Sequence, residues 1–497
     1  MASSNTKASS QDEKEMGTGI EFVADPDAGL SEAEREKIDR DLVRKLDMRL
    51  IPWLCILYLA SFLDRTNIGN AKIEGLVKDL NMTSGQYSAC LSIFFVSYAL
   101  FEPASNVLLK RMKPSIYIPI IMILWGLCMT FMGFVKNFSG MMAARWFLGL
   151  AEAGLFPGVS YYLSCWYKRR EFGIRVAIFF SAAAVSGSFG GLLAAAIANM
   201  DGIGGKRGWA WIFILEGIAT VIIGVISFWI VEDFPDDAKF LNDQDRARVL
   251  KRLRDDQQSS AGHEEFKTTY LWDCLRDWKT WVGMLMYMGV DGALYAFSLF
   301  LPTVILGLGG FSTTQAQLLS VPPYVAACIV TVLVGWAADR TGKRGIFNIG
   351  TSIVGIIGFA ILLGSNNAAL SYFGVFLGAL GIYPCIPNTV TWVSNNVEGV
   401  YKRGVTLGFV IGWGNLNGVM SSNVYREKDK PHYRLGHAIV LGYLAVGLLG
   451  GSILNYVLLV RENGKRRKGE RDHWIEGLDV KQIEALGDQR PDFLYTL

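Results

Sequence analysis

Four charged residues lie in segments that are otherwise apolar enough to cross a membrane. Asp64 and Arg65 are adjacent near the end of one apolar run, and Arg145 and Glu152 lie together in another. A charge at the centre of a membrane helix costs about 2.5–3.5 kcal/mol on insertion scales, so such residues usually face a bundle interior or a water-filled path. Two acids and two arginines in such a place can bind an organic anion and carry protons with it.

The spacing of Arg145 and Glu152 predicts how they cooperate. Seven residues are two turns of helix, so both side chains share one face and lie roughly 10 Å apart along the axis. They therefore line one wall and do not pair tightly with each other. Protonation of an acid would free a nearby arginine for a substrate anion. The alternative is a buried ion-pair network that only orients helices.

Composition excludes several other classes of protein. Of the 497 residues, 51% are hydrophobic and 19% are charged, below the roughly 25% charged residues of soluble domains. The net charge of +3 predicts no nucleic-acid partner. The seven cysteines are scattered without zinc spacing, and no catalytic-triad or phosphate-loop pattern occurs. We expect no enzyme, no cofactor other than coupling protons, and no cleaved signal peptide.

Apolar runs long enough to span a bilayer as helices recur in two sets of six. The expected spans are 50–70, 86–108, 115–135, 139–164, 172–199, 209–231, 279–305, 317–338, 347–364, 369–393, 403–424 and 436–460. We predict an all-α membrane protein of twelve transmembrane helices, built as two six-helix bundles with pseudo-twofold symmetry. The expected domains are an N-terminal tail with an amphipathic helix (1–49), a first bundle (50–231), a central loop (232–278), a second bundle (279–460) and a C-terminal tail (461–497).

The short loops give the expected orientation. Lys and Arg follow spans two, four, eight and ten, which places both termini and the central loop in the cytoplasm. The loop after span eleven is an exception, because it contains Arg426, Lys428, Lys430 and Arg434. Before the first span, Ser31 and Glu34 form a capping-box pattern that begins an amphipathic helix expected to lie on the membrane surface. A second short helix is expected over 242–256.

The segment between spans eight and nine reads Gly335-Trp-Ala-Ala-Asp339-Arg340-Thr-Gly342-Lys-Arg344. It resembles the GxxxDRxGrR signature of the major facilitator superfamily. The physical roles are clear: Gly335 allows two helices to approach closely, Asp339 can pair with an arginine, and Gly342 permits a tight turn. The equivalent first-half loop lacks the glycine and the acid.

Two further segments resemble a subfamily. Residues 63–71, around Asp64-Arg65, and 144–154, around Arg145 and Glu152, are similar to the anion:cation symporters. Other segments look like the fungal allantoate and nicotinate permeases within that family. The resemblance implies that Arg65 holds a substrate carboxylate, that Asp64 and Glu152 bind the coupled protons, and that Arg145 responds to the state of Glu152.

The second half must supply the rest of the site, and it has no deep arginine. Span ten contains Asn388 and Trp392 after a proline that breaks the helix, and span eleven contains Asn415. Tyr295 in span seven could stack on an aromatic ring. For these residues, plain packing or hydrogen bonding between helices is the alternative. Three more acids lie within spans: Glu102 and Glu216 are expected to be structural, and Asp291 is an outside candidate for the site.

These observations predict a monomeric, proton-coupled importer of a small organic anion, in particular nicotinate, in a fungal plasma membrane. It would work by alternating access within the lipid bilayer. Other acids, such as allantoate, pantothenate or a sugar acid, are alternative substrates. Export of an acidic secondary metabolite and a non-transporting nutrient sensor are alternative functions.

Overall fold

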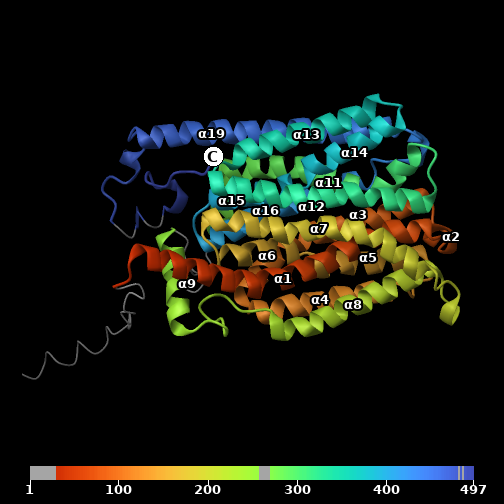
Figure 1. Ribbon diagram of the computed structural model, residues 1–497, viewed down its shortest axis with the longest axis horizontal. Helices are drawn as coiled ribbons and strands as arrows, with labels where there is room; N and C mark the ends of the chain where they lie inside the picture. Colours follow the sequence, from red (N-terminus) through yellow and green to blue (C-terminus); the bar gives the residue numbers. More distant parts are fainter. Residues whose placement is uncertain (1–28, 257–268, 480–481, 484–485) are drawn as a thin grey trace, which may run out of the picture.

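The computed structural model describes residues 29–256, 269–479, 482–483 and 486–497. The long helices run side by side along one axis (Figure 1), and the described residues contain no β-strand. The beginning of α1, the short helix α9 and the last residues of the chain lie at one end of the bundle. We call this the tail end and the opposite end the far end.

The expected helical architecture is confirmed. Within the described part of the chain, ten segments are long and apolar enough to cross a membrane. Two other expected spans, 139–164 and 403–424, are each interrupted: one consists of α5 and α6 and the other of α16 and α17. The first half comprises α1 (Glu32–Ile73), α2 (Leu76–Asp79), α3 (Ser84–Arg111), α4 (Pro114–Met132), α5 (Phe138–Glu152), α6 (Leu155–Ser164), α7 (Arg169–Ala198), η1 (Ile203–Gly205) and α8 (Gly208–Ile230).

The second half has the same plan. It comprises α11 (Trp278–Gly307), α12 (Thr313–Thr341), α13 (Arg344–Gly364), α14 (Ala368–Ile382), α15 (Cys385–Asn395), α16 (Val400–Leu416), α17 (Gly418–Ser421), η2 (Glu427–Asp429), α18 (Arg434–Gly442), η3 (Tyr443–Gly450) and α19 (Gly451–Arg467). Between the halves lie α9 (Asp243–Asp255) and α10 (Thr269–Arg276), and η4 (Asp472–Trp474) and η5 (Gly487–Gln489) follow α19.

The helix α1 differs from the prediction at its beginning. Its capping box is present, because Ser31 and Glu34 each accept a hydrogen bond from the other's backbone. However, the expected surface helix and the first span form one continuous helix. Its apolar side chains Leu42 and Leu46 are buried by protein. Asp39 nearby pairs with Arg252 of α9 at 3.1 Å. The apolar side chains of this part of α1 therefore pack against the protein.

Glycines mark the closest helix contacts, and these contacts differ within and between the halves. Some contacts within a half are against backbone: a Cβ on Gly149 would lie 2.3 Å from the carbonyl oxygen of Phe94, and one on Gly381 would lie 2.2 Å from the nitrogen of Gly355. At the junction of the halves, a Cβ on Gly335 would lie 2.5 Å from the Cβ of Ala177, a side-chain atom. A backbone contact cannot yield to a new side chain, so Gly149 and Gly381 hold their helices closely together within each half.

Candidate substrate and proton site

Arg65 lies at the junction of the two halves and bonds to both. Its side chain is 4% exposed, and Nη2 donates to Glu152 Oε1 at 2.7 Å. Ser61 Oγ donates to the same oxygen at 2.5 Å. On the other side, Arg65 Nη1 donates to the hydroxyl of Tyr295, which belongs to α11 of the second half. Three predicted site residues, Arg65, Glu152 and Tyr295, are thus brought together.

A chain of hydrogen bonds continues from Tyr295 back to the first half. The Tyr295 hydroxyl donates to Asn415 Oδ1 at 2.8 Å. Asn415 Nδ2 then donates to Glu102 Oε2 at 3.1 Å. We call Arg65, Glu152, Tyr295, Asn415 and Glu102 the central cluster. It contains one cation and two carboxylates, and its bonds cross between the halves twice.

Aromatic rings surround the Arg65 guanidinium. Its central carbon lies 4.9 Å from the ring centre of Tyr98, 5.5 Å from that of Phe94 and 5.6 Å from that of Tyr295. Such contacts stabilise a desolvated cation. Tyr98 and Phe94 are missing from the sequence-based set, although their four-residue spacing, continued by Glu102, places all three on one face of α3. This four-residue periodicity could have indicated from the sequence that they belong to one site.

Arg145 lies near the same aromatic wall. It is 1% exposed, and its guanidinium carbon lies 5.9 Å from the ring centre of Phe94. Its Nε and Nη2 atoms have no hydrogen-bond partner among the described residues. Arg145 precedes Glu152 by two turns of α5, on the side of the far end, as the spacing predicts. A buried cation with unused donors is suited to receive an anion.

Asp64 lies apart from the central cluster. Its Oδ2 accepts hydrogen bonds from Trp125 Nε1 at 3.1 Å and from Thr220 Oγ1 at 2.7 Å. These partners belong to α4 and α8, so Asp64 faces the interior of the first half. Its Oδ1 has no partner among the described residues. Glu216 lies on the same side of α1, where it accepts a hydrogen bond from Asn67 at 2.6 Å.

Two predicted substrate residues lie elsewhere. Asn388 Nδ2 donates to the carbonyl oxygen of Arg344 at 3.0 Å, and Trp392 Nε1 donates to that of Thr496 at 2.9 Å. Both residues lie on α15 towards the tail end. The predicted break of span ten is present, because α14 ends at Ile382 and α15 begins at Cys385. The residues after the break join α13 and the C-terminal segment and do not reach Arg65.

Two acids, Glu102 and Asp291, lie closer to Arg65 and Tyr295 than the sequence predicted. Glu102, expected to be structural, belongs to the central cluster. Asp291 is 2% exposed, and its Oδ2 has no hydrogen-bond partner within the described part of the chain. It precedes Tyr295 by about one turn of α11. Across the described residues, no group of three or more His, Cys, Asp or Glu side chains could hold a metal ion.

The GxxxDRxG-like segment closes the tail end between the halves. Asp339 Oδ2 accepts a hydrogen bond from the backbone N–H of Ile174 in α7 at 2.6 Å. The same carboxylate pairs with Arg344. Gly342 has a φ of +66° and ends α12. Arg340 is exposed and lies over the ring of Trp336, so the arginine that pairs with Asp339 is Arg344.

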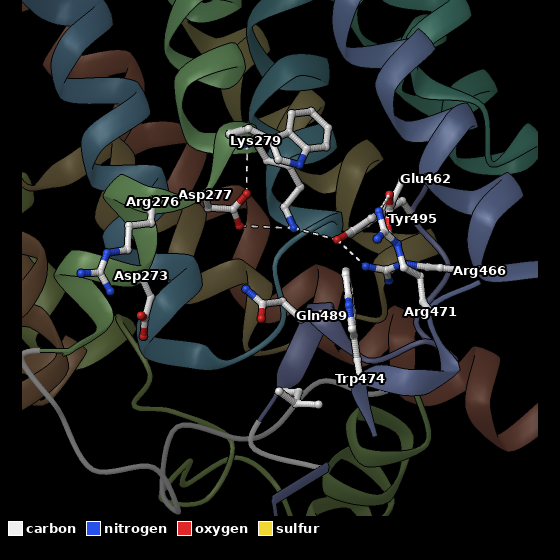
Figure 2. Close-up of a pocket in the computed structure, with 12 residues that line it drawn as sticks. Asp273, Arg276, Asp277, Lys279, Glu462, Arg466, Arg471, Trp474, Gln489 and Tyr495 are labelled. Atoms are coloured by element: carbon white, nitrogen blue, oxygen red, sulfur yellow. Dashed lines mark hydrogen bonds and ion pairs between the residues drawn. The ribbon is translucent and has the colours of Figure 1, made fainter. Parts of the chain in front are cut away.

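The C-terminal segment also packs onto the tail end. Asp488 pairs with Lys279 and, at 2.7 Å, with Lys402. Burial alone would raise the pKa of Asp488, but the two lysines outweigh it, so this pKa lies below its ordinary value. Arg466 donates to the hydroxyl of Tyr495 at 2.8 Å. Lys279, Arg466 and Tyr495 line a cavity of about 730 Å³ (Figure 2), where acidic and basic groups are interleaved.

The segment touches both halves. The backbone N–H of Arg344 donates to the carbonyl oxygen of Leu497 at 2.6 Å, within the second half. Arg169 of the first half lies 5.0 Å from the ring centre of Phe493. The last residues therefore add to the closure that Asp339 makes.

Comparison with known proteins identifies relatives that are membrane transporters. Residues 54–422 match the family model of the Major Facilitator Superfamily. An uncharacterised transporter of Schizosaccharomyces pombe is 35% identical over 464 residues, which cover 93% of this chain and 94% of the relative. The high-affinity nicotinic acid transporter of Saccharomyces cerevisiae is 32% identical over 492 residues, covering 98% of this chain and 90% of that protein.

The fold is also similar to a solved structure. The major facilitator proton:xylose symporter XylE, bound to 6-bromo-6-deoxy-D-glucose, matches with a TM-score of 0.61 and 15% sequence identity. The match covers 80% of this chain and 95% of that chain. At this identity the likeness concerns the fold alone.

Proposed function

Because the chain belongs to the major facilitator superfamily, a family of multi-pass membrane transporters, we propose that it imports a small organic anion together with protons. The observation that carries the proposal is the position of Arg65. It is buried at the junction of the halves, paired with Glu152 of one and hydrogen-bonded to Tyr295 of the other. A substrate carboxylate on Arg65 would therefore be sensed by both halves.

The pair of Arg65 and Glu152 supports the coupling to protons. When Glu152 is ionised, it occupies the guanidinium with two bonds, at 2.7 and 3.2 Å. Protonation of Glu152 removes the charge attraction, and the guanidinium can then bind a carboxylate in the bidentate manner that arginine favours. Proton and anion thus bind together, and release of the proton on the other side returns Arg65 to Glu152 and expels the anion.

Asp64 is the second proposed proton site. It is fully buried, and no cation pairs with it among the described side chains. A buried unpaired charge is costly, so Asp64 would carry a proton through the conformational change. Arg145, with its unused donors, would stabilise a nearby negative charge, either the substrate carboxylate or that of Glu152. Asn415 and Tyr295 would bind substrate oxygens from the second half.

The aromatic surroundings of Arg65 favour a flat monocarboxylate, and nicotinate fits this description. Its ring could stack on Tyr98 or Phe94 while its carboxylate meets the guanidinium. The similarity to the high-affinity nicotinic acid transporter of Saccharomyces cerevisiae supports the same substrate. We propose a fungal plasma membrane as the location.

Alternating access follows from the two kinds of contact. The proposed moving units are residues 50–231 and 279–460, held internally by glycine-to-backbone contacts. The basic residues near the tail end support a cytoplasmic tail end with both termini inside. Inward opening would then separate α7 from α12 and break the hydrogen bond of Ile174 to Asp339. The far end would be the external entrance.

The test is uptake of labelled nicotinate by cells that express the protein, at external pH 5 and 7.5. We expect faster uptake at pH 5, and loss of uptake in an Arg65→Ala form that reaches the surface. Glu152→Gln should bind the anion but show a weaker pH dependence, since the amide cannot release a proton and only Asp64 remains as a proton site. Absence of uptake for nicotinate and for a panel of other carboxylates, with the protein at the surface, would overturn the proposal.

A further inference from the structure

The basic loop after span eleven, which breaks the charge pattern of the other loops, lines a cavity at the far end. The cavity holds about 380 Å³ between the two halves, and we call it the far-end vestibule. Its basic side chains are Lys72 from α1, and Arg426 and Lys428 from the loop. Three of its aromatic residues are Tyr87, Phe300 and Tyr425. The vestibule thus combines positive charge with ring faces, as the surroundings of Arg65 do.

Two of the charges in the loop, those of Arg426 and Lys428, are available to a ligand. Arg426 and Lys428 are exposed, and among the side chains that the structure describes neither forms an ion pair. Asp429 follows Lys428 in the sequence, and its Oδ2 has no hydrogen-bond partner among the described residues. Arg426 Nε donates only to the carbonyl oxygen of Asn423, at 3.3 Å. Charges that hold the fold together would be paired, as Arg344 is with Asp339 at the tail end.

The vestibule lies directly beyond the central cluster. Helix α1 contributes Arg65 to the cluster and Lys72 to the vestibule, two turns further on. Helix α11 contributes Tyr295 and then Phe300. At 1.5 Å per residue, these pairs are separated by about 10 and 8 Å along their helices. The same helices therefore build both sites, one above the other.

Helix α3 also contributes residues to both sites, and these residues lie further apart along the helix than those of α1 and α11. Tyr98 lies beside Arg65, and Tyr87 lies in the vestibule, eleven residues earlier. Between them is Phe94, whose ring is close to the guanidinium groups of both Arg65 and Arg145. Arg145, with its two unpartnered nitrogens, is therefore positioned between the vestibule and Arg65. From the far end inward, the substrate would meet the cations of the vestibule first, then Arg145 with its free donors, and then Arg65, which is paired with Glu152.

We propose that the far-end vestibule is a capture site for the anionic substrate, occupied before the central cluster, with Lys72, Arg426 and Lys428 as the attracting charges. This inference rests on the proposed function. The ligand is a small carboxylate with a planar ring: the carboxylate meets the cations, and the ring lies against Tyr87, Phe300 or Tyr425. Arg145 then receives the carboxylate as the substrate moves inward.

The test measures nicotinate uptake into osmotically balanced proteoliposomes containing the wild type or the Arg426→Gln, Lys428→Gln double variant. Two unit charges acting across about 10 Å of water predict a rise in KM of about three- to five-fold at low salt, with the maximal rate unchanged. The difference should vanish near 1 M salt, where the Debye length falls from about 30 Å at 0.01 M to about 3 Å. Both residues are exposed, so the variant should fold.

Arg434→Gln is the matched control. Arg434 belongs to the same basic stretch, but it donates to Asn366 Oδ1 at 3.1 Å and does not line the vestibule. Its replacement should leave KM unchanged. An equal rise in KM in the control would overturn the inference, because a general surface charge would then explain the effect. An unchanged KM in the double variant, with proton-coupled uptake intact, would refute the vestibule's role as a capture site and leave the proposed function standing. If the wild type transports no carboxylate, both fall.

Discussion

Replacing Arg65 with alanine tests the centre of the proposed mechanism, and the structure sets the size of two separate effects. The substrate would lose a charge-assisted contact, worth about 2–5 kcal/mol for a buried pair. A value near 3 kcal/mol corresponds to a rise in KM of about 150-fold. The protein would also lose stability, because Glu152, 0% exposed, would stay buried without the cation that pairs with it. Breaking a buried pair in this way costs about 3–5 kcal/mol.

The two effects can be separated with a second substitution. Arg65→Ala combined with Glu152→Gln removes both charges, so thermal stability in detergent should return most of the way to the wild-type value. Transport should stay lost, because the substrate still has no cation to bind. Arg65→Lys keeps the charge but not the bidentate geometry, and it should give intermediate uptake with near-normal stability. The assay pairs labelled uptake with surface quantification and a melting curve for each form.

Two results would refute this reasoning. If Arg65→Ala reaches the surface and takes up nicotinate with an unchanged KM, the guanidinium does not bind the substrate. If the double variant melts as low as the single variant, the unpaired charge of Glu152 is not the cause of the instability. The second result would mean that the ion pair of Arg65 and Glu152 does not stabilise the protein. Glu152 could then not be the anion that competes with the substrate for Arg65.

Three further changes test other parts of the structure. Asp339→Asn weakens a charge-assisted hydrogen bond worth about 1.5–3 kcal/mol, so amide hydrogen exchange in the first turns of α7 should become roughly 10- to 100-fold faster. Asp488 has a pKa below its ordinary value, so its ion pairs are lost only as the pH falls through the lowered pKa. The protection factors of residues 486–497, which correct for the base-catalysed rise of intrinsic exchange, should therefore be constant from pH 5 to 8 in the wild type and lower throughout in Asp488→Asn. Gly149→Ala places a Cβ 2.3 Å from a carbonyl oxygen of α3 and should lower stability by about 1–3 kcal/mol in thermal unfolding, whereas Gly350→Ala, with nothing within 4 Å, should not.

The sequence predicted best those features that are costly in a membrane. Arg65 and Glu152 are conspicuous because charged side chains rarely remain in apolar segments without a function. The structure places them in one ion pair, at the junction of the halves. The helix ends at Ser31 and Asn242 were also predicted, because capping is a local interaction over three or four residues.

Positions that depend on distant parts of the chain could not be predicted in the same way. Trp392 and Asn396 contact Thr496, about one hundred residues away, and no local pattern indicates that a polar tail folds back. Asn388 was predicted to bind substrate, and its bond to the backbone of Arg344 on α13 could not be foreseen for the same reason. Tyr98 was missed because an aromatic residue in a membrane helix is usually a packing residue. Its role depends on where Arg65 lies in space.

The glycine contacts also bear on how proteins of this architecture change over evolutionary time. Within each half, Gly149 and Gly381 lie against backbone that no neighbouring substitution can move. Across the junction, Gly335 faces a side chain, and the central cluster is made of side chains alone. The junction can therefore be altered through side chains while Gly149 and Gly381 keep their contacts within the halves. Substrate preference would change at least cost to folding by paired substitutions, because a single change that separates Glu152 from Arg65 leaves a buried group without its partner.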